Sequence, residues 1–284
     1  MVGANPPALP GRRCKKASAR LSVRVADELV AIACLEAGAD EAQVPAVGLS
    51  ANRPVPPGIV AVLPRIAHDR ELGPLLRWAT DDARVVVGNL GLVKAAADRG
   101  ANVAADWPLN AINAHSVAQL AELGASFVWL SPELSGRQVA RVAEDACIDV
   151  GLGVYGRQEL MVTEHCILMA EGPCEQRCGS CERRAGKRVL RDRKGYEFPV
   201  VTDITGRSHV YNSVPLDLTV AVPEIIAAGV SAVRLDLELD ELDTAVRQTR
   251  RFGGLLERAA CGVVPAARDR DSATTSGHYF RGVL

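Results

Sequence analysis

The stretch that decides the fold is residues 22–44, SVRVADELVAIACLEAGADEAQV. It begins with a short β-branched run, Ser22–Val25, and continues with an Ala- and Leu-rich run, Asp27–Ala37. Gly38 follows, and then a second candidate strand, Glu41–Val44. Glycine just after the last helical residue is a common stop signal for a helix. A strand, a helix and a second strand in this order predict a parallel βαβ unit.

The same alternation continues along most of the chain. Further candidate strands are Ile59–Leu63, Arg84–Val87, Asn102–Ala105, Phe127–Leu130, Val150–Val154 and Ala232–Leu237. The candidate helices between them are Leu72–Thr80, Leu92–Arg99, Ala114–Leu123 and Gly136–Asp145. Eight strands alternating with helices predict an α/β fold, a TIM-like (β/α) barrel. A doubly wound sheet has the same alternation and is the alternative.

The alternation breaks between the seventh and eighth candidate strands. Residues 160–215 carry four cysteines and a strand-like piece, Tyr196–Asp203. We therefore expect a single barrel domain over 21–284, with a cysteine-bearing insertion at 160–215. Residues 1–20 contain five basic residues and no acid, and we expect a disordered basic tail there. Barrel active sites form at the C-terminal ends of the strands, so an insert after the seventh strand is expected to cover that mouth.

Composition excludes several classes of protein. The 33 Lys and Arg residues against 34 Asp and Glu give a net charge of −1, which excludes a globally basic nucleic-acid coat protein. Aromatic residues make up 4%, which argues against a stacking platform for single-stranded nucleic acid. No apolar run approaches the length of a membrane span, and the N-terminus does not resemble a secretory signal. We therefore expect a cytoplasmic protein in a reducing compartment.

Four of the eight cysteines crowd into one short stretch: Cys166, Cys174, Cys178 and Cys181. In a reducing compartment such a group indicates a metal site rather than a disulfide framework. Structural zinc usually takes two pairs of closely spaced cysteines, whereas here three are bunched and the fourth lies upstream. That spacing resembles a cubane cluster. The sequence predicts a [4Fe–4S] cluster, with zinc or no metal as the alternatives.

The remaining cysteines indicate less. Cys34 and Cys147 lie in apolar runs, and we expect both to be buried small hydrophobes. Either could replace Cys166 as the fourth ligand if the fold brings it close. Cys14 falls in the basic tail, and the pattern around Cys261 favours no particular role.

Several short motifs follow one another in a fixed order. They are Asp106–Asn113 (DWPLNAIN), Leu130–Leu134 (LSPEL), Leu160–Cys166 with the three cysteines after it, Asp192–Val200 and Gly277–Gly282 (GHYFRG). In this order they resemble peptidase family U32, the collagenase-like family. The resemblance covers about Val23 to Val283, nearly the whole chain.

This resemblance implies more than one activity. The family name implies a peptidase, although the sequence has neither a His-Glu-x-x-His helix nor a Gly-x-Ser-x-Gly elbow. Better-understood relatives are oxygen-independent hydroxylases that carry a [4Fe–4S] cluster on four cysteines. They modify RNA bases or the ubiquinone ring, and prephenate is implicated as the hydroxyl donor for some. The resemblance thus implies an iron–sulfur hydroxylase acting on RNA or a small aromatic substrate. Because some relatives act as heterodimers, it also implies a paralogous partner subunit, with a non-catalytic, metal-stabilised subunit as a further alternative.

The cysteine spacing departs from that pattern. The U32 hydroxylases usually spread their four cysteines more widely, so the substrate stays open. Cys174-x-x-x-Cys178-x-x-Cys181 is also the spacing of radical S-adenosylmethionine enzymes. Those enzymes place the motif after the first strand, usually with an aromatic residue before the last cysteine, where this chain has Ser180.

Two residues near the cysteines are candidates for proton transfer. Glu164 lies two residues before Cys166, where a carboxylate beside a cluster could act as a general acid or base. A salt bridge to a barrel arginine is the alternative. His209 could shuttle a proton or be a satisfied structural histidine.

Five further residues are candidates for substrate binding. Asn110 and Asn113 could hold a carboxylate or ring carbonyl, or could cap the next helix. Tyr155 and Arg157 follow the seventh strand, where an arginine could grip a carboxylate or lie exposed in a loop. Arg234 lies between apolar residues of the last strand and needs an acidic partner, for which Glu133 and Glu164 are candidates.

The insert also contains a basic segment, Arg177–Lys194. Its charge could meet the phosphates of RNA. A solvated lid is the alternative.

Overall fold

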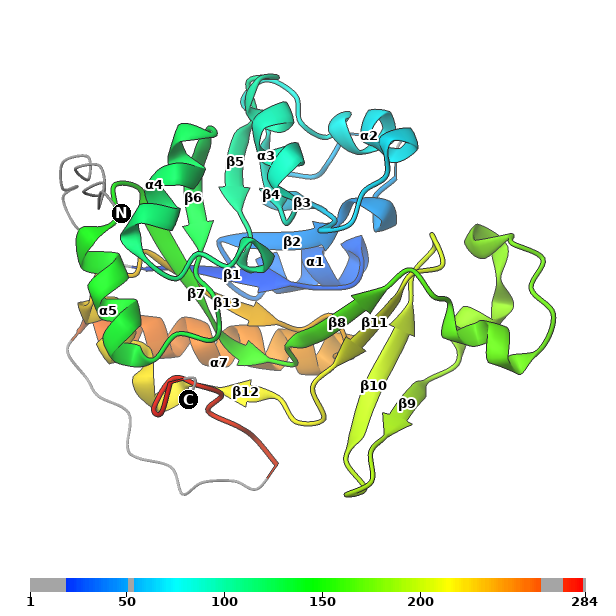
Figure 1. Cartoon of the computed structure of the whole chain (residues 1–284). Coiled ribbons are helices and arrows are strands. Elements are labelled where there is room, and N and C mark those ends of the chain that lie inside the picture. The colour runs from blue at the N-terminus through cyan, green and yellow to red at the C-terminus, as the bar shows by residue number, and fades with distance from the viewer. Residues whose placement is uncertain (1–18, 51–53, 262–272, 283–284) are drawn as a thin grey trace, which may run out of the picture. The chain divides into compact units, whose positions relative to one another are not determined.

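Eight parallel strands form a closed ring (Figure 1). They are β1 (Arg20–Arg24), β2 (Glu41–Pro45), β3 (Ile59–Leu63), β4 (Arg84–Val87), β5 (Asn102–Ala105), β6 (Ala125–Trp129), β7 (Asp149–Gly156) and β13 (Ala232–Asp236). Each strand from β1 to β7 pairs with the next, and β13 pairs with both β7 and β1. The predicted TIM-like barrel is confirmed, because a doubly wound sheet would leave two edge strands unpaired.

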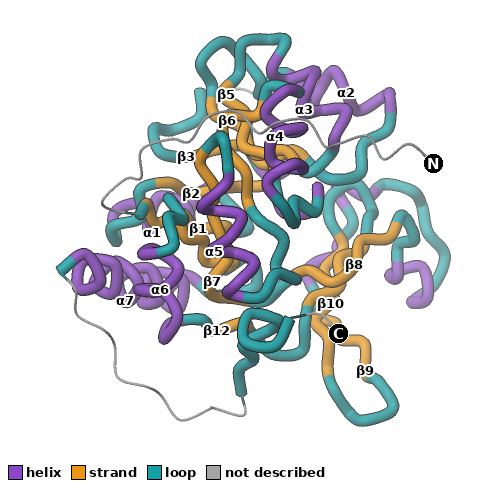
Figure 2. The backbone as a smooth tube through the Cα atoms, turned by 60° about the vertical axis from the view of Figure 1, so that its left-hand side comes forward, coloured by secondary structure: helices purple, strands orange, loops and turns teal. Residues whose placement is uncertain are grey.

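The helices lie outside the strands (Figure 2). They are α1 (Glu28–Glu36), α2 (Asp69–Leu76), α3 (Leu90–Ala97), α4 (Ala114–Glu122), α5 (Gly136–Asp145), α6 (Val222–Ala227) and α7 (Leu242–Ala260). The side chain of Asp27 accepts the Val30 N–H and starts α1, and Gly38 at φ +104° follows its end. The computed structural model describes residues 19–50, 54–261 and 273–282, so nearly all of the expected basic tail lies outside the described residues.

One predicted helix was placed too late in the sequence. We expected Leu72–Thr80, whereas α2 covers Asp69–Leu76. The carboxylate of Glu71 accepts the backbone N–H of His68 at 2.9 Å, which fixes an earlier start.

A small apolar core fills the centre of the barrel. Val60, Val86, Ala104, Phe127, Trp129 and Ala232 form this cluster. The rings of Phe127 and Trp129 meet edge to face with centroids 5.0 Å apart. On the neighbouring strand β7, a Cβ on Gly151 would lie 2.5 Å from Trp129 and 2.7 Å from Phe127. The glycine on β7 therefore makes room for the two aromatic side chains.

The chain divides into two compact units. The cysteine unit comprises Gly156–Asp217 and the described residues of Arg270–Thr275, and the barrel unit comprises the other described residues. The cysteine unit contains an antiparallel sheet in the order β8, β11, β10, β9 (Figure 1), and a short strand β12. These strands are β8 (Glu159–Thr163), β9 (Arg188–Arg191), β10 (Glu197–Thr202), β11 (Ser208–Tyr211) and β12 (Leu216–Asp217). β10 matches the predicted strand-like piece. Within the described ranges, no helix combines the length and apolarity needed to cross a membrane.

Candidate metal centre

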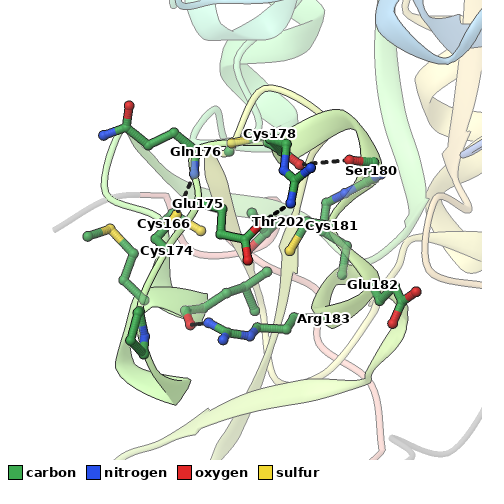
Figure 3. Close-up of a pocket in the computed structure, with 16 residues that line it drawn as sticks. Cys166, Cys174, Glu175, Gln176, Cys178, Ser180, Cys181, Glu182, Arg183 and Thr202 are labelled. Carbon is green, nitrogen blue, oxygen red and sulfur yellow. Dashed lines mark hydrogen bonds and ion pairs between the residues drawn. The ribbon is translucent and has the colours of Figure 1, made fainter.

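The four clustered cysteines lie in and between three short 3₁₀ helices that follow β8. These helices are η3 (Ile167–Glu171), η4 (Cys178–Ser180) and η5 (Glu182–Ala185). Cys166 precedes η3, Cys174 lies between η3 and η4, Cys178 begins η4, and Cys181 separates η4 from η5. All four thiols are free and line one cavity of about 410 Å³. Figure 3 shows Cys166 and Cys174 on one side of that cavity and Cys178 and Cys181 on the other. The structure therefore brings together the four cysteines that the sequence singled out.

Two local features shape the surroundings of individual sulfurs. The backbone N–H of Gln176 donates to Sγ of Cys174 at 3.4 Å. A Cβ on Gly206 would come within 2.8 Å of Sγ of Cys178, and Gly206 adopts φ +92°. Only glycine gives both this backbone conformation and the space for the sulfur.

The four thiols influence one another electrostatically. Burial raises the pKa of the Cys178 thiol, and Cys166, Cys174 and Cys181 raise it further. Like charges close together disfavour ionisation unless a cation compensates them. A bound metal centre would supply that compensation.

The donor set fits a thiolate-ligated metal or cluster, because four soft ligands face one cavity. Over the described ranges, no three His, Cys, Asp or Glu side chains are already arranged around a metal position. Binding would therefore require the cysteine side chains to move together. Cys34 is fully buried on α1, as expected for a small hydrophobe, whereas Cys147 is only half-buried.

Three of the six arginines of the basic segment pair with carboxylates inside the cysteine unit. Arg177 pairs with Glu175, Arg191 with Glu197 and Arg188 with Glu171. These carboxylates neutralise part of the charge that the sequence offered to phosphates. The electrostatic argument for an RNA-binding surface is correspondingly weaker.

The two proton-transfer candidates both lie in ionic contacts. The carboxylate of Glu164 accepts from Nε of Arg207 at 2.7 Å, so its salt bridge is to an arginine of the cysteine unit rather than of the barrel. Nδ1 of His209 lies 2.6 Å from Glu159, and its Nε2 lies 3.5 Å from Asp203. Burial disfavours protonation of this ring, but hydrogen bonds to Asp203 and Glu159 outweigh it and raise the pKa of His209 to about 9. A catalytic role for either residue stays a prediction.

The loop residues proposed for substrate binding have local structural roles. Asn113 caps α4, since its side chain accepts the Ser116 N–H at 2.8 Å. Asn110 ends a 3₁₀ turn, η2 (Trp107–Leu109), at φ +52°, a conformation that asparagine tolerates better than most residues. Both asparagines are exposed.

Tyr155 and Arg157 do not share a compact unit. The ring of Tyr155 packs on Phe252 of α7, with centroids 5.4 Å apart. Arg157 belongs to the cysteine unit and donates Nη1 to the carbonyls of Asn212, at 2.9 Å, and Ser213. Their proposed contacts with substrate stay predictions.

Arg234 is 2% exposed inside the barrel. The expected partners, Glu133 and Glu164, were wrong: Nη1 lies 2.8 Å from Asp106, and Nε lies 2.7 Å from Asp236. These carboxylates come from the carboxyl ends of β5 and of Arg234's own strand, so they face the same interior layer. Arg234 also lies over the ring of Trp129, 4.9 Å from its centroid.

Sequence reasoning missed the rest of this layer. Arg24, at the end of β1, contacts the second carboxylate oxygen of Asp106 at 2.8 Å and the side chain of Gln43 at 3.0 Å. Burial opposes ionisation of Asp106, but Arg24 and Arg234 outweigh it and hold the pKa of that carboxyl below its usual value. Arg24 and Arg234 provided the available signal. Each is an arginine at an inward position near the end of its strand, and the two strands are neighbours. A buried arginine needs an acidic partner.

The chain is a closed (β/α)₈ barrel protein with a cysteine-bearing insertion after its seventh strand. The sequence model of peptidase family U32 matches residues 73–271, so the chain belongs to that family. No protein of curated function matches it.

Solved structures resemble the chain only distantly. The U32 peptidase Mk0906 is 15% identical, with a TM-score of 0.39 over 52% of this chain and 72% of its own. A structure described as native KDPGal is 13% identical, with a TM-score of 0.47 over 86% of this chain and 96% of its own. For 2,3-dimethylmalate lyase the identity is 13% and the TM-score 0.43, over 90% of this chain and 88% of its own. The fold assignment rests on the strand pairing rather than on these likenesses.

Proposed function

We propose that this chain is a U32-family iron–sulfur protein that hydroxylates an RNA base or an aromatic or quinone ring without molecular oxygen. The observation that carries the proposal is that four free thiols line one cavity of a single compact unit. Cys166, Cys174, Cys178 and Cys181 would hold a [4Fe–4S] cluster, with zinc as the alternative occupant. When bound, the cluster would supply electron transfer.

The chain's own residues would protect and adjust this site. The Gln176 N–H donates to the Cys174 sulfur, and hydrogen bonds to ligating sulfurs influence the potential of a cluster. Arg183 and Arg184 line the same cavity and place positive charge beside the thiolates. Glu164 would handle a proton only after partial release from Arg207, its ion-pair partner.

The hydroxylation needs a donor because molecular oxygen takes no part. A ring hydrogen and the hydroxyl group of the donor exchange places, which leaves the ring oxidised and the donor reduced by two electrons. Prephenate, implicated for relatives, is the donor we propose. Of the two substrate classes, the small aromatic ring suits the charge distribution better, because carboxylates of the cysteine unit already pair with Arg177, Arg188 and Arg191.

The family label names a second activity, proteolysis, which the site geometry does not favour. Both ring nitrogens of His209 already face carboxylates, so this ring is not arranged as the base of a cysteine nucleophile. The activity assay described below distinguishes a peptidase or a non-catalytic subunit from the proposed enzyme.

The deciding experiment is metal analysis of protein purified without oxygen. We expect about four irons and four sulfides per chain and a visible thiolate-to-iron absorption. Cys178→Ala should lose them, whereas Cys261→Ala, which changes an exposed cysteine at the end of α7, should not. One zinc and no iron would refute the iron–sulfur proposal.

The activity is then tested with the loaded protein under anaerobic conditions. We expect mass spectrometry to detect one added oxygen in an aromatic or quinone precursor, or in a nucleoside from RNA, only when prephenate is present. If the protein cleaves peptides, and thiol alkylation abolishes this cleavage, the result would support a peptidase instead. A loaded protein that performs neither reaction alone, but does so with a paralogous chain, would indicate the subunit role.

A further inference from the structure

The segment that joins Cys166 to Cys174 lies against the segment that follows Cys181. The first contains η3, whose amide N–H of Met169 donates to the carbonyl of Cys166 at 3.1 Å. Its Leu168 side chain is 3% exposed and anchors this turn in the cysteine unit. The second contains η5, which carries Arg183 and Arg184.

Arg183 connects these two segments directly. Its Nη1 donates to the carbonyl of Gly172 at 3.1 Å and to the carbonyl of Leu168 at 3.4 Å. Both acceptors lie between Cys166 and Cys174, and the donor lies two residues after Cys181. One guanidinium therefore fixes the separation of the upstream and downstream cysteines.

Two neighbouring arginines complete the arrangement. Arg188 pairs with Glu171 at the end of η3, with Nη2 2.8 Å from Oε2, and this hydrogen bond raises the pKa of Arg188, with smaller contributions from Cys181 and Cys166. Arg184 donates to the carbonyl of Gly179 at 2.8 Å, inside the turn between Cys178 and Cys181. Of the three, only Arg183 binds two carbonyls of the opposite segment.

We propose that Arg183 is the positioning residue of the cysteine centre: it holds the Cys166–Cys174 segment against the Cys178–Cys181 segment so that four sulfurs can reach one metal or cluster. The inference rests on the proposed function for the identity of the metal, but its geometry concerns the four thiols alone. Arg183 uses neutral carbonyl acceptors for these two bonds, so its charge also remains beside the thiolates. Lysine would keep that charge, but its side chain is one atom shorter than that of arginine and its ammonium lacks the fixed N–H directions of the guanidinium.

The test measures binding of Co²⁺ to the full-length apoprotein by its thiolate charge-transfer absorption. Arg183→Gln should weaken Co²⁺ binding by about 10-fold or more, the range typical of residues that orient metal ligands. Arg183→Lys should restore little of this loss. Arg193→Gln changes an exposed arginine outside the cavity lining and should bind Co²⁺ like the unchanged protein. Equal affinity in Arg183→Gln and the unchanged protein would overturn the inference, as would full rescue by lysine, which would assign the effect to charge.

Hydrogen exchange supplies a readout that needs no metal. Amides of Met169 and Gly172 should exchange faster in Arg183→Gln, while amides in the β10–β11 pairing keep their protection. Faster exchange in both places would mean that the unit has unfolded, and would refute a local positioning role. Binding of Co²⁺ without assembly of an iron–sulfur cluster would refute the proposed function and leave the Arg183 result standing. An unchanged protein that binds neither would overturn both.

Discussion

Replacing Asp106 by alanine should destabilise the barrel by removing the carboxylate that two buried arginines share. Asp106 is 3% exposed, Arg24 7% and Arg234 2%, so water cannot take over the lost contacts. Breaking a buried ion pair by removing one partner costs about 3–5 kcal/mol. Arg234 keeps Asp236 and Arg24 keeps Gln43, which places the expected loss near the lower end, about 3 kcal/mol.

The assay is urea unfolding of the unchanged protein and Asp106→Ala at neutral pH, followed by circular dichroism. For a chain of this size, a loss of about 3 kcal/mol corresponds to a melting temperature lower by about 6–12 °C. Asp98→Ala is the matched control, because Asp98 pairs with Lys94 on the surface with side chains 59% and 56% exposed. It should change stability by less than about 0.5 kcal/mol.

A loss below about 1 kcal/mol for Asp106→Ala would refute the reasoning, because the two guanidiniums would then have found other compensation. Asp236→Ala offers an internal comparison. It removes only one contact of Arg234 and leaves the Asp106 contact, so its effect should be the smaller of the two.

Three further predictions concern the cysteine unit and α4. The pKa of His209 in the folded protein is about 9, against an ordinary value of 6.5, so the ring is protonated at neutral pH. Its ion pairs therefore stabilise the fold fully below about pH 6.5, and this contribution is lost as the pH rises through 9. A urea titration series should show that slope, and His209→Gln should flatten it; an unchanged slope would contradict the assignment. Gly206→Ala should cost about 1 kcal/mol or more and weaken Co²⁺ binding at Cys178, whereas Gly195→Ala, at φ +85° with nothing within 4 Å, should carry the backbone strain alone. Equal Co²⁺ affinities of the two glycine variants would show that the sulfur contact is unimportant. Asn113→Ala should cost about 1 kcal/mol through the lost helix cap, and Asn113→Ser should keep both stability and turnover; loss of turnover in a stable serine variant would show that this amide binds substrate.

The sequence predicted the barrel well because its strands have a strong local signal. Short β-branched runs separated by helices and glycines placed all eight strands to within a few residues, from Ser22–Val25 against β1 to Ala232–Leu237 against β13. Helices depended more on tertiary context. The long helix α7 was not anticipated, and its sequence contains a Gly253–Gly254 pair that weakens the local helical signal.

Long-range partners were the least predictable part of the site. The four cysteines could be grouped because they are close in sequence, and they do line one cavity. Arg234 could be recognised as needing an acid, but its partner Asp106 lies 128 residues away and faces it only because the barrel closes. Likewise, nothing local in the sequence indicates that Arg183 reaches the carbonyl of Gly172.

Gly151 on β7 predicts a pattern of residue types across related sequences. Since the Cβ of any other residue at position 151 would come within 2.5 Å of Trp129, the two positions must vary together. Relatives that carry a side chain at position 151 should carry a residue smaller than tryptophan at position 129, so that the filled volume at this level of the barrel is conserved. Covariation between these two positions would therefore record a packing constraint, and it would be expected even among members that differ in substrate.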